Sequence, residues 1–139
     1  MNAPVRDWSD LQAPSLDDVE ILARDALARL PPEFLALCEG VTIHVEDFPD
    51  DATLREMECE SEFDLLGLFR GIGLAQGGEV ATGQWHNRVW LYRRPLLDYW
   101  AEHEETLGHL VTHVLVHEIG HHMGLSDDDM AAIEAAADE

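Results

Sequence analysis

The stretch from Thr106 to Met123 constrains the fold more than any other, because it predicts a helix that is apolar on two sides. At about 100° per residue, one broad apolar sector lies roughly opposite a second apolar group. The first sector holds Leu107, Leu110, Val111, Val114 and Leu115, and the second holds Val116, Ile119 and Met123. Since such a helix is buried, we expect it to run through the middle of the fold, with a sheet on one side and other helices on the other.

The same helix carries the motif H-E-x-x-H, formed by His117, Glu118 and His121. Helix positions four apart lie one above the other, so the two imidazoles point at one metal-sized position. Glu118 lies about 100° from His117, where it can touch a water on the metal without being a ligand. Two imidazoles, one carboxylate and an open position for water are typical of a catalytic zinc site.

Gly124 and Asp127 follow His121 at offsets that extend the motif. A shuffled chain of this composition would contain the bare motif about 5% of the time, but the extended motif in only roughly 0.04% of cases. Gly124 can adopt the left-handed conformation that ends a helix, so that Asp127 can return to the metal. We interpret Asp127 as the third ligand and as part of the cap of a last helix; the alternative is a cap alone.

Further histidines continue the spacing of four, at His113 and His109. His113 lies about 40° from His117 around the helix axis. It is an alternative ligand, a donor to a ligand or, as is more common, a partly buried or solvent-facing histidine. His122 projects about 100° away from His121 and is not expected to be a ligand.

The charge of the chain excludes some classes of function. Against 8 Lys and Arg stand 29 Asp and Glu, which gives a net charge of −21. Nucleic acids and anionic membranes require clustered basic residues, so neither is an expected partner. The acidic surface is compatible with a basic peptide, but solubility explains it as well.

The cysteine content and the absence of targeting signals predict a location. Two cysteines, Cys38 and Cys59, are too few for a disulfide framework, and we expect both to be reduced. The N-terminal residues show no secretory pattern, and no apolar run is long enough to cross a membrane. These features favour a cytoplasmic protein, which we expect to be a monomer.

Residues 15–139 predict a single α+β domain after a flexible N-terminal arm, residues 1–14. Its mixed sheet of about three to four strands would pack on the central metal-binding helix, with flanking helices around it. Periodicity and breakers place strands at 41–45, 65–70 and 87–92, and further helices at 15–30, 33–38, 52–60, 95–100 and 130–137. Five glycines in 71–83 predict a flexible loop that could form a lid or one rim of a cleft.

These motifs resemble those of the zincin metallopeptidases. The extended motif is similar to the metzincin pattern H-E-x-x-H-x-x-G-x-x-H, with Asp127 in place of the last His, as in snapalysin-type proteases. Segments 65–71, 89–96 and 117–130 resemble a family of small, minimal zincin-like bacterial proteins. Metzincins also place a Met beneath the metal, whereas Met130 lies only three residues after Asp127 and is expected in the core of the last helix.

The resemblance implies a zincin-like domain that binds one Zn²⁺ through His117, His121 and Asp127. It implies Glu118 as the general base and a peptide or protein as the substrate. Such clefts hold an extended peptide along a sheet edge, and either strand 65–70 or strand 87–92 could provide that edge.

The sequence is compatible with three functions. The leading hypothesis is a zinc-dependent peptidase that uses a metal-activated water. The second is a non-catalytic, metal-stabilised protein-binding module, and the third is a regulatory protease specific for one protein partner. Glu118 favours catalysis, because a structural zinc site has no use for a base beside an open position. A fourth protein ligand, such as His113, would favour the binding module.

Overall fold

The computed structural model describes residues 8–71 and 87–137. After a 3₁₀ turn at Trp8–Asp10, these residues form six helices and three strands. The helices are α1 (Leu16–Arg29), α2 (Pro32–Leu37), α3 (Asp51–Glu56), α4 (Arg93–Glu102), α5 (Leu107–His122) and α6 (Asp127–Ala137). The strands are β1 (Thr42–Glu46), β2 (Gly67–Arg70) and β3 (Arg88–Tyr92). The α+β class predicted from the sequence is confirmed.

The sheet is mixed, with strand order β1-β3-β2. The central strand, β3, pairs in parallel with β1, so that Ile43 lies opposite Val89. On its other side β3 pairs antiparallel with β2, so that Leu68 lies opposite Trp90. The last strand in sequence is therefore inserted between the first two, which leaves β1 and β2 at the edges.

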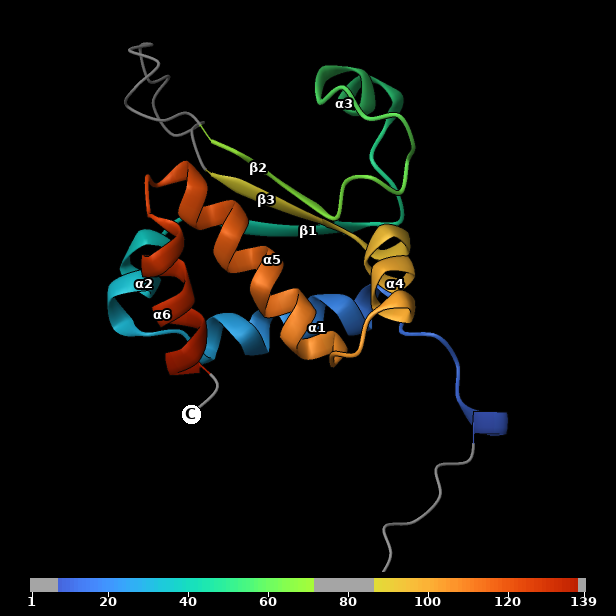
Figure 1. Cartoon of the computed structure of the whole chain (residues 1–139), viewed down its shortest axis with the longest axis horizontal. Coiled ribbons are helices and arrows are strands. Elements are labelled where there is room, and N and C mark those ends of the chain that lie inside the picture. Colours follow the sequence, from blue (N-terminus) through green and yellow to red (C-terminus); the bar gives the residue numbers. More distant parts are fainter. Residues whose placement is uncertain (1–7, 72–86, 138–139) are drawn as a thin grey trace, which may run out of the picture.

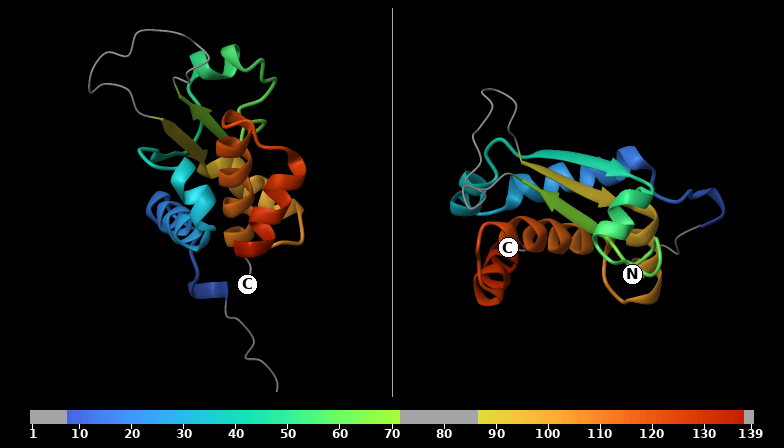
Figure 2. Two further views of the ribbon diagram at one scale, coloured as in Figure 1. Left: turned by 90° about the vertical axis from the view of Figure 1, so that its left-hand side faces the viewer. Right: turned by 90° about the horizontal axis from the view of Figure 1, so that it is seen from above.

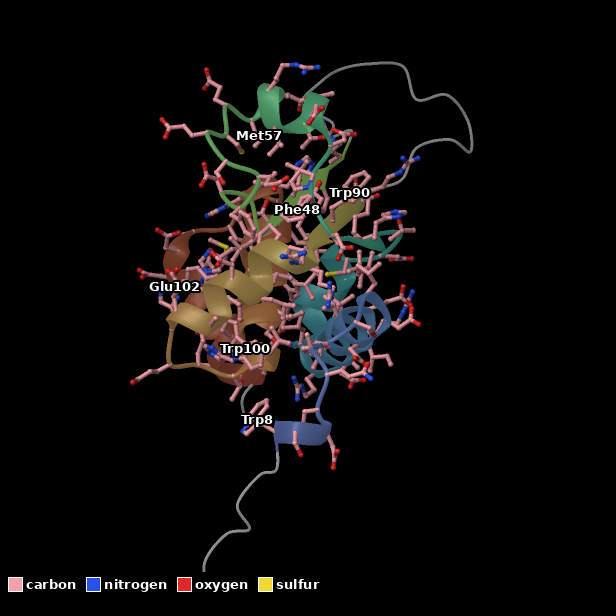
Figure 3. All side chains as sticks on the ribbon, turned by 90° about the vertical axis from the view of Figure 1, so that its right-hand side faces the viewer. Trp8, Phe48, Met57, Trp90, Trp100 and Glu102 are labelled. Carbon is pink, nitrogen blue, oxygen red and sulfur yellow. The ribbon has the colours of Figure 1, made fainter. Side chains whose placement is uncertain are left out.

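Helix α5 lies under the sheet, with α1 beside it on the same face (Figures 1 and 2). It contacts β2 and β3 above it and packs against α1, α4 and α6 around it. The small helix α3 lies on the other side of the sheet, and Trp90 and Phe48 lie beneath it (Figure 3). The central position expected for the motif-bearing helix is thus confirmed.

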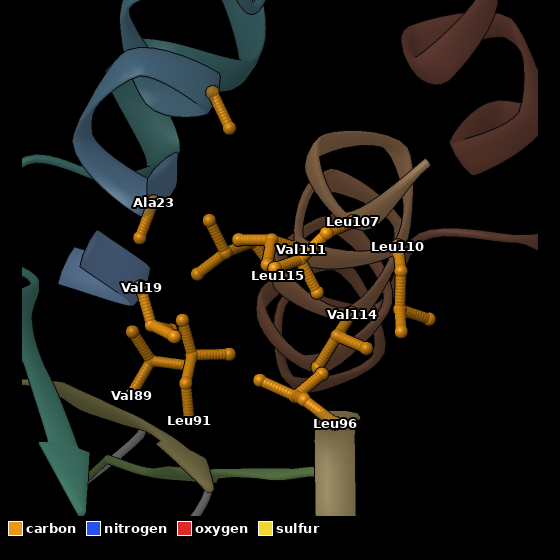
Figure 4. Packing of buried hydrophobic residues seen from close by; sticks show 11 residues of the cluster. Val19, Ala23, Val89, Leu91, Leu96, Leu107, Leu110, Val111, Val114 and Leu115 are labelled. Carbon is orange, nitrogen blue, oxygen red and sulfur yellow. The ribbon is translucent and has the colours of Figure 1, made fainter. Parts of the chain in front are cut away.

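The two apolar sectors of α5 enter two separate core clusters. The first sector packs with Val19 and Ala23 of α1 and with Val89 and Leu91 of β3 (Figure 4). The second sector, with Val116 and Ile119, forms a cluster with Phe34 of α2, with Met130 and Ala137 of α6, and with Leu30 at the end of α1. Burying one such large side chain contributes about 1.5–3 kcal/mol, so α5 is held from both sides.

Capping hydrogen bonds fix the starts of the helices. Ser15 and Asp18 form a capping box at the start of α1, in which each side chain accepts from the other residue's backbone N–H. The hydroxyl of Thr106 accepts from the backbone N–H of His109 and begins α5.

Among the described residues, no helix is long and apolar enough to cross a membrane.

Local chemistry explains the differences from the expected boundaries. Helix α3 ends at Glu56, before the expected end at Glu60, because Glu58 takes a left-handed conformation with φ of 56°. Helix α4 begins at Arg93 and not at Pro95, since proline is tolerated in the first turn, where backbone N–H groups have no helical acceptor. The glycine-rich loop expected at 71–83 falls, after Gly71, outside the described residues.

Candidate metal centre

Helix α5 brings His117 and His121 to one side of the fold, where Asp127 meets them. The two imidazole rings are 5.5 Å apart between centroids and nearly perpendicular. One ligand atom from each of the three residues lies within 4.8 Å of the others. Zinc ligands about 2.0–2.2 Å from a tetrahedral metal stand roughly 3.4 Å apart. Small side-chain rotations would close this difference, and the side chains of His121 and Asp127 are 60% and 90% exposed.

Gly124 turns the chain so that Asp127 reaches the histidines. Gly124 has a φ of 83°, as expected from its position after the helix. The backbone N–H of Leu125 donates to the carbonyl oxygen of Gly120 at 2.9 Å, and that of Gly124 donates to His121 at 3.2 Å. These two bonds form the left-handed cap that ends many helices, and the Nε2 of His121 lies 3.8 Å from Oδ1 of Asp127.

The cap of α6 is formed by Ser126 and Asp129. The Ser126 hydroxyl accepts from the backbone N–H of Asp129 at 3.0 Å, and the Ser126 N–H donates to the Asp129 carboxylate at 3.1 Å. The capping role that we expected for Asp127 is therefore wrong, because this reciprocal pair already satisfies the helix start. For the same reason α6 begins at Asp127 and not at Met130. The Asp127 carboxylate is left facing His121.

Glu118 lies under the start of β2. Its carboxylate is half-buried, and this burial raises the pKa of Glu118 above its ordinary value, while the charge of His121 acts in the opposite direction. A Cβ added at Gly67 would stand 3.5 Å from Cγ of Glu118 and only 2.7 Å from Cγ1 of Val114. The absence of a side chain at Gly67 thus allows β2 to approach α5 at Val114 and Glu118.

The structure adds Glu134 of α6, which the sequence motifs did not identify. Its carboxylate joins two histidines: Oε1 lies 2.8 Å from Nδ1 of His113, and Oε2 lies 3.2 Å from Nε2 of His117. The side chain of Glu134 is only 14% exposed. In the sequence, Glu134 is distinguished by being the single charged residue between Met130 and Ala137, which could have marked it as a candidate.

His109, His122 and Met130 lie outside the group formed by His117, His121 and Asp127. His109 pairs with Glu105 at 3.2 Å, one turn before His113. The ring of His122 packs on Phe69, with 4.1 Å between the centroids. Met130 is fully buried in the core, and its side chain lies against Gly120, as expected for a core residue of the last helix.

The strand order leaves only one of the two expected edges available. Strand β3 lies between β1 and β2, so residues 87–92 are not an edge. Strand β2 pairs with β3 on one side, and on its other side no strand of the described ranges pairs with it. The edge of the sheet that runs past Glu118 is therefore that of β2.

Comparison with known proteins identifies the family. The family model of zincin-like metallopeptidases matches residues 38–137, more than two thirds of the 139 residues. The match includes every strand, α5 and its motif, and α6. No curated protein matches the chain. With the mixed sheet over a central H-E-x-x-H helix, this match shows that the chain belongs to the zincin-like metallopeptidase family.

Proposed function

We propose that this protein is a zinc-dependent peptidase in which His117, His121 and Asp127 hold one Zn²⁺ and Glu118 is the general base. The observation that carries this proposal is the position of Glu118, which is half-buried beside the candidate ligands and next to Gly67 of the edge strand. A base, a metal position and a sheet edge at one place are what peptide hydrolysis requires.

The donor set has the chemistry that zinc prefers. Two imidazoles and one carboxylate leave the fourth tetrahedral position open, as in catalytic zinc sites. Among the described residues, this group of candidate ligands contains no cysteine. Structural zinc sites commonly use cysteine, so this composition also favours a catalytic zinc. Zinc bound here would supply Lewis acidity, which activates water and polarises a peptide carbonyl.

The residues of the chain supply the proton transfer and the orientation of the substrate. A carboxylate oxygen of Glu118 accepts a proton from the attacking water and returns it to the nitrogen of the departing amine. In the metal-free protein, burial raises the pKa of Glu118, which is the direction that favours a general base. The edge of β2 that pairs with no strand of the described ranges binds an extended peptide, which sets the carbonyl over Glu118.

The decisive experiment compares zinc-loaded wild type with Glu118→Gln on a peptide library. We expect wild type to cleave peptides and Glu118→Gln to lose about 10²–10⁴-fold in rate, with its zinc content unchanged. Glu105→Gln, which alters another glutamate next to a histidine, is the matched control and should retain full activity. Equal rates for Glu118→Gln and wild type would refute the mechanism.

The metal-stabilised binding module remains a second candidate because of one observation. Glu134 and His113 offer two further ligands beside His117, and structural zinc sites are closed by protein ligands. A wild-type protein that binds zinc and gains thermal stability, but hydrolyses no peptide of the library, would favour this candidate. A regulatory protease would share the chemistry above and differ only in its substrate.

A further inference from the structure

His113, His117 and Glu134 form a compact donor group at the junction of α5 and α6. One ligand atom from each lies within 4.8 Å of the other two. The rings of His113 and His117 are 4.0 Å apart between centroids, and the Glu134 carboxylate bridges them. The group is not a surface cluster of acids, since Glu134 is 86% buried and both partners are imidazoles. Its composition, two histidines and one carboxylate, is the same as that of the group His117, His121 and Asp127.

His117 is common to both groups, and this restricts how they can be filled. A neutral imidazole has one lone pair for a metal, because its other nitrogen carries a proton. The two groups are therefore alternatives, with one metal per chain.

We propose that His113, His117 and Glu134 form a second zinc position, alternative to the position at His121 and Asp127. This inference rests on the proposed function for the first position, and it assigns new ligands that lie outside the extended motif. In both positions the carboxylate ligand belongs to α6, as Asp127 in the first and Glu134 in the second. The fraction of zinc bound at each position depends on these two carboxylates.

Zinc in the second position lies away from the base. Around the axis of α5, His113 is about 40° from His117 in one direction, whereas Glu118 is about 100° from it in the other. His113 also lies one helical turn before His117, whereas Glu118 directly follows it. A zinc held by His113 and Glu134 has no general base beside it, so this position is inactive.

The test measures zinc affinity by competition with a chromophoric chelator, together with the ¹⁵N shifts of the histidine side chains. The proteins are wild type, Asp127→Ala, Glu134→Gln, and Asp127→Ala combined with either Glu134→Gln or His113→Ala. We expect one zinc per chain in wild type and in Asp127→Ala. Either second substitution should lower the affinity of Asp127→Ala by roughly tenfold or more.

The His113 resonance distinguishes ligation from mere support of His117. In Asp127→Ala it should shift when zinc is added, and His113→Ala should weaken binding as much as Glu134→Gln does. Glu105→Gln in the Asp127→Ala background is the matched control, because Glu105 pairs with His109 at 3.2 Å outside the group. It should leave the affinity unchanged, and circular dichroism checks the fold of every variant.

Three results would overturn the inference. These are equal affinities for Asp127→Ala with and without Glu134→Gln, a His113 resonance that ignores zinc, or two zinc ions per wild-type chain. Failure of the proposed function looks different: zinc binds with the expected pattern in every variant, but no hydrolysis depends on Glu118.

Discussion

Gly67 on β2 and Glu118 on α5 are in close approach, because a Cβ at position 67 would stand 3.5 Å from Cγ of Glu118. This contact joins the edge of the sheet to the candidate base. It depends on the lack of a side chain at Gly67, since the same Cβ would also lie 3.0 Å from the carbonyl oxygen of Trp90.

Gly67→Ala should therefore separate β2 from α5. The backbone of Trp90 cannot yield without disturbing the sheet, so we expect a loss of about 1–3 kcal/mol in the free energy of unfolding. Urea unfolding measures it. Gly108→Ala is the control, because a Cβ there meets only Leu22 at 3.8 Å; as a helical glycine it should gain about 0.5–1 kcal/mol. Equal stabilities for the two variants would contradict the close approach.

Gly120→Ala should be destabilising for a different reason. A Cβ at Gly120 would stand 2.6 Å from Sδ of Met130, a fully buried side chain. We expect a loss of about 1–3 kcal/mol from overpacking. Because the conflict is with one side chain, the double variant Gly120→Ala with Met130→Ala should be more stable than the sum of the two single losses predicts. Strict additivity in thermal unfolding would argue against this contact.

The helix cap and the metal ligand can be separated at the start of α6. Ser126→Ala removes the hydroxyl that accepts from Asp129, and we expect it to lower the stability of the metal-free protein by about 1 kcal/mol. Asp127→Ala should change metal-free stability little, because its carboxylate is exposed and caps nothing. The same variant should weaken zinc binding, which calorimetry measures. A larger loss of metal-free stability in Asp127→Ala than in Ser126→Ala would reverse the two roles.

Cys38 should be a slow nucleophile. Burial raises the pKa of its thiol from about 9.0 to about 11. Since the thiolate is the reactive form, alkylation of Cys38 at pH 8 should be roughly a hundredfold slower than for an ordinary thiol. The variant Cys59→Ser isolates this reaction, and its rate with iodoacetamide should keep rising up to about pH 11. A plateau near pH 9 would show an unperturbed thiol.

The same shift links stability to pH. The folded protein holds the Cys38 proton more tightly than the unfolded chain does, because the thiol pKa is raised on folding. This contribution to stability is fully present below about pH 9.0 and is lost as the pH rises towards about 11. Cys38→Ala should remove this part of the alkaline loss, which denaturant unfolding at several pH values would measure.

The central helix could be predicted because its information is local. The two apolar sectors of α5 follow from a period of 3.6 residues and predicted its burial, and in the structure each sector enters a core cluster. The left-handed conformation of Gly124 was likewise implied by its place after His121. By contrast, Glu134 meets His117 across 17 positions of sequence and two helices, so no local periodicity connects them.

The choice of sheet edge depends on strand order, which is also non-local. Residues 65–70 and 87–92 have similar strand patterns, and only the pairing of β3 with both neighbours decides which one is exposed. The cap at Ser126 illustrates a third limit. Ser126 and three consecutive aspartates predict a helix start, but which aspartate caps depends on backbone geometry.

The insertion of β3 between β1 and β2 has a consequence for how the chain acquires its structure. In the described ranges each edge strand pairs only with β3, so no strand pairing of this sheet exists until residues 88–92 are available. The parallel pairing joins Thr42 to Arg88, a loop closure that is slow compared with helix formation. During synthesis on the ribosome, the sheet therefore assembles only after β3 has emerged, and the H-E-x-x-H helix emerges after all three strands.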